Sequence, residues 1–102
     1  MELVKAKLIT IITERLLRHE ITDMIKLKGA TGYTRSEVEG EGSRGIRASD
    51  FEGRNVKIET IVSESVADAI MQEVSENYFE NYAVIAYVRD VEVARGAKYL
   101  RR

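Results

Sequence analysis

The strand-like and helix-like segments of this chain alternate in an order that few folds can accommodate. Leu3–Thr13 is rich in Ile, Val, Leu and Thr, and its nearly continuous apolar run predicts a strand buried on both faces. Helical spacing of apolar residues then predicts a helix from about Glu14 to Lys28, with Gly29 as its stop. The apolar stripe of this helix is formed by Leu17, Ile21, Met24 and Ile25. Thr31–Gly40 follows as a second predicted strand, so the first half is β-α-β.

The second half repeats the same order of elements. Alternation of apolar and polar residues predicts a third strand over Val56–Ser63. Either Ser63 or Ser65 can then cap a second helix. The inner face of that helix is marked by Val66, Ala67, Ile70, Val74 and Tyr78. Tyr82–Val88 is almost entirely apolar, which predicts a central fourth strand, and Val91–Ala94 is predicted to be a short edge strand before a basic tail.

Two β-α-β halves of similar length predict an α+β domain of the ferredoxin-like type, with the order βαββαβ. The 102 residues are enough for one domain, so residues 1–102 are expected to fold as a single unit. A domain of this size buries only about 60–65% of its unfolded surface. Its apolar faces are therefore expected to gain further cover by association with other subunits.

The loop between the two halves, from Gly40 to Asn55, is the segment with the clearest functional pattern. About 15 residues without regular structure is long for a compact domain, and such loops are usually functional. The loop begins Gly40-Glu41-Gly42-Ser43-Arg44-Gly45-Ile46-Arg47. Glycines allow the backbone to approach an anion, and the planar guanidinium groups of Arg44 and Arg47 suit phosphate oxygens. The loop is therefore expected to be flexible without ligand and to bind phosphate.

Composition argues against several other classes of protein. The formal net charge is -1, which argues against nucleic acid as a partner, and the absence of Cys excludes disulfides and thiolate metal sites. The only histidine, His19, is expected to lie on the surface, and no partner for acid–base catalysis is evident. We therefore expect no metal site and no catalytic residues. With no signal peptide or membrane-spanning segment in the sequence, a cytoplasmic location is expected.

The motifs resemble a specific family. The run Gly29-Ala30-Thr31-Gly32-Tyr33-Thr34 and the loop pattern Gly-x-Gly-Ser-Arg-x-x-Arg look like those of PII-like signalling proteins linked to bicarbonate uptake. This group includes SbtB and the carboxysome-associated PII proteins. Asn55-Val56-Lys57-Ile58-Glu59 and the segment from Tyr78 to Tyr87 continue the resemblance in the same order, so that it covers nearly the whole chain.

This resemblance implies a homotrimer with nucleotide-binding clefts between neighbouring subunits. The loop at about residues 40–55 corresponds to the T-loop, which docks on a membrane transporter or an enzyme. By position, Ser43, Arg44 and Arg47 would hold the phosphates of AMP, cyclic AMP, ADP or ATP. The loop base would approach the phosphates through Gly40 and Gly42, and the adenine would be enclosed by Gly32, Thr34 and the backbone near Val84.

The implied function is control of a transporter, of the bicarbonate type, by adenine nucleotides, with bicarbonate as a further candidate ligand and no enzymatic activity. The sequence departs from nitrogen-regulating PII proteins, because Asn55 replaces a lysine and Glu80–Val84 replaces their Gly-Asp-Gly-Lys loop. These differences argue against a sensor of Mg-ATP and 2-oxoglutarate. Two alternatives stay open on the sequence: a small phosphohydrolase of the acylphosphatase type and a trimeric metal-tolerance protein.

Overall fold

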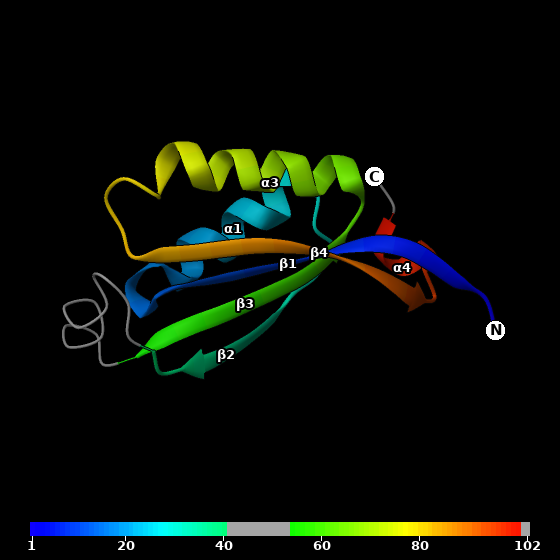
Figure 1. Cartoon of the computed structure of the whole chain (residues 1–102), viewed down its shortest axis with the longest axis horizontal. Coiled ribbons are helices and arrows are strands. Elements are labelled where there is room, and N and C mark those ends of the chain that lie inside the picture. Colours follow the sequence, from blue (N-terminus) through cyan, green and yellow to red (C-terminus); the bar gives the residue numbers. More distant parts are fainter. Residues whose placement is uncertain (41–53, 101–102) are drawn as a thin grey trace.

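A computed structural model describes residues 1–40 and 54–100 of the chain, and it shows one four-stranded sheet with the two longer helices on one face (Figure 1). Most of the predicted loop, and the last two arginines, lie outside the described residues. The strands are β1 (Leu3–Glu14), β2 (Thr34–Val38), β3 (Asn55–Val62) and β4 (Val84–Ala94). The helices are the 3-10 turn η1 (Arg15–Leu17), α1 (Arg18–Lys28), α3 (Glu64–Asn77) and the short α4 (Ala97–Leu100).

The predicted order βαββαβ is confirmed, and the strands assemble in the spatial order β2-β3-β1-β4. All three strand pairs are antiparallel. In the middle of the sheet, Ile11 of β1 lies opposite Ile58 of β3 on one side and Ala86 of β4 on the other. This register places Ile11 and Ile58 on the face of the sheet that α1 and α3 cover (Figure 1).

The core forms between that face and the two helices, as the periodicity predicts. In β3 the buried residues alternate with partly buried ones over the whole strand. The predicted stripe of the first helix is buried, and it consists of Leu17 at the end of η1 and Ile21, Met24 and Ile25 of α1. The N-terminus of α3 is capped by Ser63, whose Oγ accepts a hydrogen bond from the Val66 amide at 3.3 Å. Gly29 ends α1 with a φ of 127°, a conformation that favours glycine.

The structure corrects three boundaries. The first helix is preceded by the 3-10 turn η1 and begins at Arg18, later than predicted, and β2 spans only Thr34–Val38 of the predicted Thr31–Gly40. Instead of two separate strands at the end of the chain, β4 runs without interruption from Val84 to Ala94. It is also an edge strand of the subunit and not a central one, because β1 alone of the described strands pairs with it. The apolar sequence predicted a central strand because it requires both faces of the strand to be covered. Coverage of the two faces does not require a neighbouring strand at both edges.

The face of the sheet opposite to α1 and α3 carries apolar side chains that the subunit leaves accessible. On β4, Ile85 is 56% exposed and Tyr87 is 41% exposed. They lie opposite Ile12 and Thr10 of β1, which alternate with the core residues of that strand. No helix within residues 1–40 and 54–100 is long and apolar enough to cross a membrane.

The sheet narrows at one end to a two-stranded extension, which we call the arm. It consists of Leu3–Ala6 of β1 and Val91–Ala94 of β4, which pair with each other beyond the point where the β1–β3 pairing begins at Lys7. The short helix α4 lies beside the arm (Figure 1). The arm and α4 thus stand at the end of the sheet opposite to the predicted loop.

Candidate functional site

Four of the predicted site residues belong to the described part of the chain. Gly32 lies two residues before β2, and Thr34 is the first residue of β2. Gly40 follows that strand, and Val84 is the first residue of β4. The other four lie outside the described residues, and they are Gly42, Ser43, Arg44 and Arg47. The structure therefore locates the residues predicted to contact the base, and of those predicted to lie at the phosphates it describes Gly40.

The predicted base-contacting residues are not brought together within one subunit. Gly32 and Thr34 belong to the β2 edge of the sheet, whereas Val84 begins β4 at the opposite edge. Three inter-strand spacings separate these edges, which corresponds to about 14 Å. Gly32 and Thr34 can contact the same small ligand as Val84 only if Val84 is supplied by a neighbouring subunit. This arrangement agrees with the inter-subunit cleft that the resemblance implies.

A pocket of about 360 Å³ opens beside the start of β2, and we call it the edge pocket. Its volume lies within the range of about 300–1,000 Å³ that small-molecule sites occupy. The lining comes from four separate segments and consists of Leu8, Thr31, Gly32, Tyr33, Thr34, Glu59, Thr60, Ile61, Lys98 and Tyr99. The pocket thus contains Gly32 and Thr34, together with residues that the sequence motifs did not identify.

Hydrogen bonds from buried threonines fix the wall of the edge pocket. The Thr60 hydroxyl, on a residue only 3% exposed, donates to the Gly32 carbonyl oxygen at 2.6 Å. The hydroxyl of Thr10 donates to Oε2 of Glu59 at 3.3 Å. Because Thr34 lies opposite Glu59 in the β2–β3 ladder, the start of β2 is held against β3. The glycine backbone therefore has a fixed position at the pocket, as a binding site requires.

Lys98 and Tyr99 of α4 enter the edge pocket from the far end of the chain. This segment was predicted only to be a basic tail, because a single helical turn shows no periodicity. Nζ of Lys98 lies 5.6 Å from the centroid of the Tyr99 ring. Gly96 could have indicated a tight turn here, because a single glycine between a strand and a tail is typical of such a turn.

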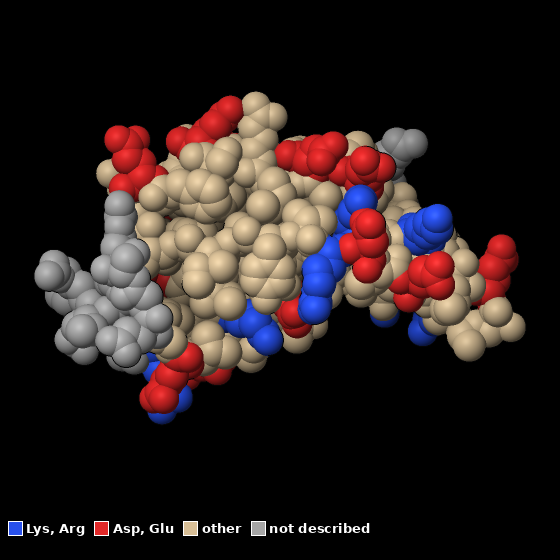
Figure 2. Space-filling model, viewed as in Figure 1, with Lys and Arg blue, Asp and Glu red and all other residues tan. Residues whose placement is uncertain are grey.

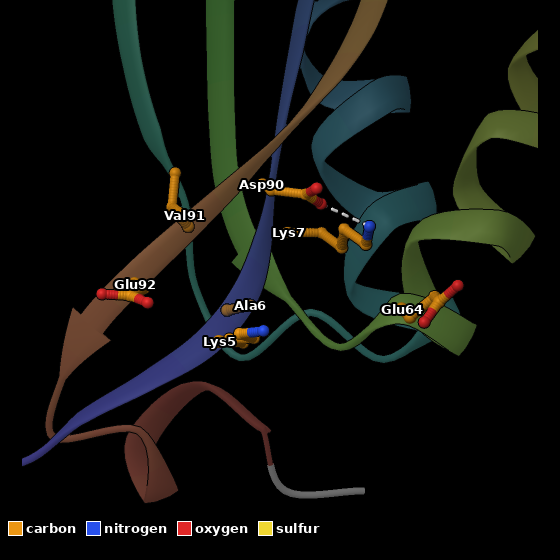
Figure 3. A pocket seen from close by; sticks show the side chains of 7 residues that line it. All are labelled: Lys5, Ala6, Lys7, Glu64, Asp90, Val91 and Glu92. Carbon is orange, nitrogen blue, oxygen red and sulfur yellow. Dashed lines mark hydrogen bonds and ion pairs between the residues drawn. The ribbon is translucent and has the colours of Figure 1, made fainter.

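A second hollow, of about 490 Å³, lies between the arm and the start of α3 (Figure 3). Lys7 Nζ donates a hydrogen bond to Asp90 Oδ1, and Glu64 stands on the other side (Figure 3). This hydrogen bond raises the pKa of Lys7 and lowers the pKa of Asp90. Side chains of both charges gather on this part of the surface (Figure 2), so it offers no concentrated positive charge for a phosphate.

The turn before Val84 is fixed by side chains at the end of β1. The Ala83 amide donates to Glu14 Oε2 at 2.9 Å, and the Ala83 carbonyl oxygen accepts from the Thr13 hydroxyl at 3.2 Å. Both backbone polar groups of Ala83 are therefore used within the subunit. Nearby, the Tyr78 hydroxyl donates to Glu20 Oε2 at 2.7 Å, and burial together with this bond raises the pKa of Tyr78. The Ala83 amide is therefore not available to a ligand at this turn.

Known structures resemble the whole subunit. A PII-like signalling protein from Thermus thermophilus is 55% identical, with a TM-score of 0.86, over 97% of this chain and 99% of that chain. CPII from Thiomonas intermedia, a nitrogen regulatory PII-like protein solved with ADP, AMP and bicarbonate, is 25% identical, with a TM-score of 0.86 over 98% of each chain. CPII with ADP and bicarbonate also matches at 25% identity, with a TM-score of 0.84 over 96% of this chain and 97% of that chain.

The family model described as nitrogen regulatory protein P-II matches residues 6–98. This range includes all of the core, the predicted loop and the start of α4. The match confirms the family that the glycine and arginine motifs indicated. The chain belongs to the PII family of signalling proteins.

Proposed function

We propose that this protein is a cytoplasmic PII-like sensor that binds an adenine nucleotide between the subunits of a homotrimer. The observation that carries the proposal is the edge pocket, in which a fixed glycine backbone at Gly32 and the hydroxyl-bearing Thr34 meet apolar and aromatic side chains. The related CPII structures are bound to ADP and AMP, which supports the same class of ligand here. The candidates are AMP, cyclic AMP, ADP and ATP.

Gly40 follows the other end of β2, about 20 Å along the strand from Thr34. The proposed ligand therefore extends from the edge pocket of one subunit toward the predicted loop of a neighbouring subunit. In the proposed trimer, Val84 of a neighbouring subunit completes the base site. Phosphates are bound by Ser43, Arg44 and Arg47, and Gly40 and Gly42 allow close approach. Bicarbonate, which is bound in the CPII structures, is a further candidate ligand.

The signal is passed on by contact with a partner and not by catalysis. We propose that the T-loop, residues 40–55, docks on a membrane transporter, of the type that imports bicarbonate, and that the bound nucleotide controls this docking. The protein itself would then lie at the membrane only through its partner. Support for this part comes from the family of signalling proteins to which the chain belongs.

The nucleotide proposal is tested by equilibrium dialysis of the purified protein against AMP, cyclic AMP, ADP, ATP and acetyl phosphate. We expect saturable binding of at least one adenine nucleotide and no turnover of acetyl phosphate. Hydrolysis of acetyl phosphate without nucleotide binding would instead favour a phosphohydrolase of the acylphosphatase type. Binding of divalent metal ions alone would favour a metal-tolerance protein.

We expect the protein to be a trimer, as is typical of the PII family, with the accessible apolar face of the sheet covered by neighbouring subunits. Replacing Ile85, which is 56% exposed on that face, by aspartate should lower the mass in sedimentation from trimer to monomer. The reason is that a carboxylate is costly to bury in an apolar contact. The matched control is Leu27→Asp, at a helix position that is 86% exposed, which should stay trimeric. A parent protein that sediments as a monomer at micromolar concentration would contradict the expectation.

A further inference from the structure

The short helix α4 is held against the rest of the fold by an unusual turn. Within residues 1–40 and 54–100, Arg95 is the one non-glycine residue with positive φ, at 60°. The next residue, Gly96, lies so close to β1 that an added Cβ would be 2.7 Å from Cγ2 of Val4. The left-handed backbone conformation of Arg95 and the lack of room for a side chain at Gly96 together fix the direction in which the chain continues after β4.

The turn leads directly into a single turn of helix. The Lys98 amide donates to the Arg95 carbonyl oxygen at 3.0 Å, and the Tyr99 amide donates to that of Gly96 at 3.0 Å. These bonds carry Lys98 and Tyr99 to the edge pocket, beside Gly32 and Thr34. Residues at opposite ends of the sequence therefore form one pocket.

The chemistry of this pocket fits a planar ring. Leu8 and Ile61 supply apolar surface, and the lining includes the aromatic residues Tyr33 and Tyr99. Aromatic side chains stack on the flat faces of heteroaromatic bases, and this contact depends little on which hydrogen-bonding groups the base carries. The Lys98 ammonium lies over the Tyr99 ring and attracts its negative face, which favours one orientation of that ring.

We propose that α4 completes the base-binding part of the site, with Tyr99 contacting the purine ring and Lys98 positioning Tyr99. This inference rests on the proposed nucleotide-binding function and assigns the base contact to a segment outside the family's glycine and arginine motifs. The edge pocket and α4 would together contact the base.

The test measures affinities for adenosine and for AMP by isothermal titration calorimetry. Tyr99→Ala should lower the affinity for both ligands by the same factor, roughly three- to tenfold, because it removes an aromatic contact to the base. Tyr99→Phe should bind like the parent, since the ring is kept. Lys98→Ala should lower the affinity for both ligands by a smaller factor. Phe79→Ala is the control, because Phe79 is an exposed aromatic residue, 43% accessible, that does not line the edge pocket.

Gly96→Ala provides an independent test, because the added methyl group would meet Val4 and displace α4 without changing a lining residue. It should lower the affinity for adenosine and AMP as Tyr99→Ala does, with the sedimentation of the parent retained. Unchanged binding by both Tyr99→Ala and Gly96→Ala would overturn the role of α4 and leave the proposed function intact. If the parent bound no adenine nucleotide at all, the proposed function would fail and this inference with it.

Discussion

Replacing Arg44 or Arg47 by alanine is expected to lower the affinity for AMP, cyclic AMP and ADP by about ten- to a hundredfold. A hydrogen bond to a charged group contributes about 1.5–3 kcal/mol, and this range corresponds to that loss of affinity. The expectation follows from the sequence, because both arginines lie outside the described residues. Adenosine, which has no phosphate, should bind weakly to the parent and change little in either variant.

The same titrations include Arg44→Lys and Arg47→Lys, which should restore only part of the affinity. Lysine keeps the charge but lacks the planar fork that grips two phosphate oxygens. Arg18→Ala is the matched control, because Arg18 is on α1 and its Nη1 donates to the Arg15 carbonyl oxygen, away from the edge pocket. If both alanine variants bound all three nucleotides like the parent, the loop would not be the phosphate site.

Replacing Ile11 by alanine is expected to lower the free energy of unfolding by about 2–5 kcal/mol, the range measured for large aliphatic residues in cores. Ile11 is fully buried in the middle of the central strand, where Ile58 and Ala86 lie opposite it. Loss of its side chain removes apolar contacts and leaves a cavity that the paired strands on both sides prevent from closing. Urea denaturation at one fixed subunit concentration measures the change, because the stability of an oligomer depends on concentration.

Leu27→Ala is the control for this experiment. Leu27 is 86% exposed on α1, so its truncation should change the free energy of unfolding by less than about 0.5 kcal/mol. Similar losses in the two variants would show that the core is not centred on the face of the sheet between β1 and the helices. Nucleotide affinity of folded Ile11→Ala should match that of the parent, because Ile11 does not line the edge pocket.

Local patterns were sufficient to predict β1 to β3, the two longer helices and most of the core, but not α4 or the unbroken β4. Alternation in Val56–Val62 identified both the strand and its buried side, because successive side chains of a strand point to opposite faces. The helical stripe ending at Met24 and Ile25 identified the core side of α1, and Ser63 was one of the two predicted caps of α3. Gly32 and Thr34 were also identified from the sequence, through their place in a family motif, and both line a pocket.

The tertiary structure decided which of these residues can act together. It placed Val84 on the strand at the opposite edge from Thr34, and it brought Lys98 and Tyr99 to the pocket. Neither result could be predicted from a local sequence pattern. Strand order and the docking of a single helical turn depend on contacts between residues far apart in the chain. Periodicity predicts only which side of an element is buried, and it does not predict which residues will cover that side.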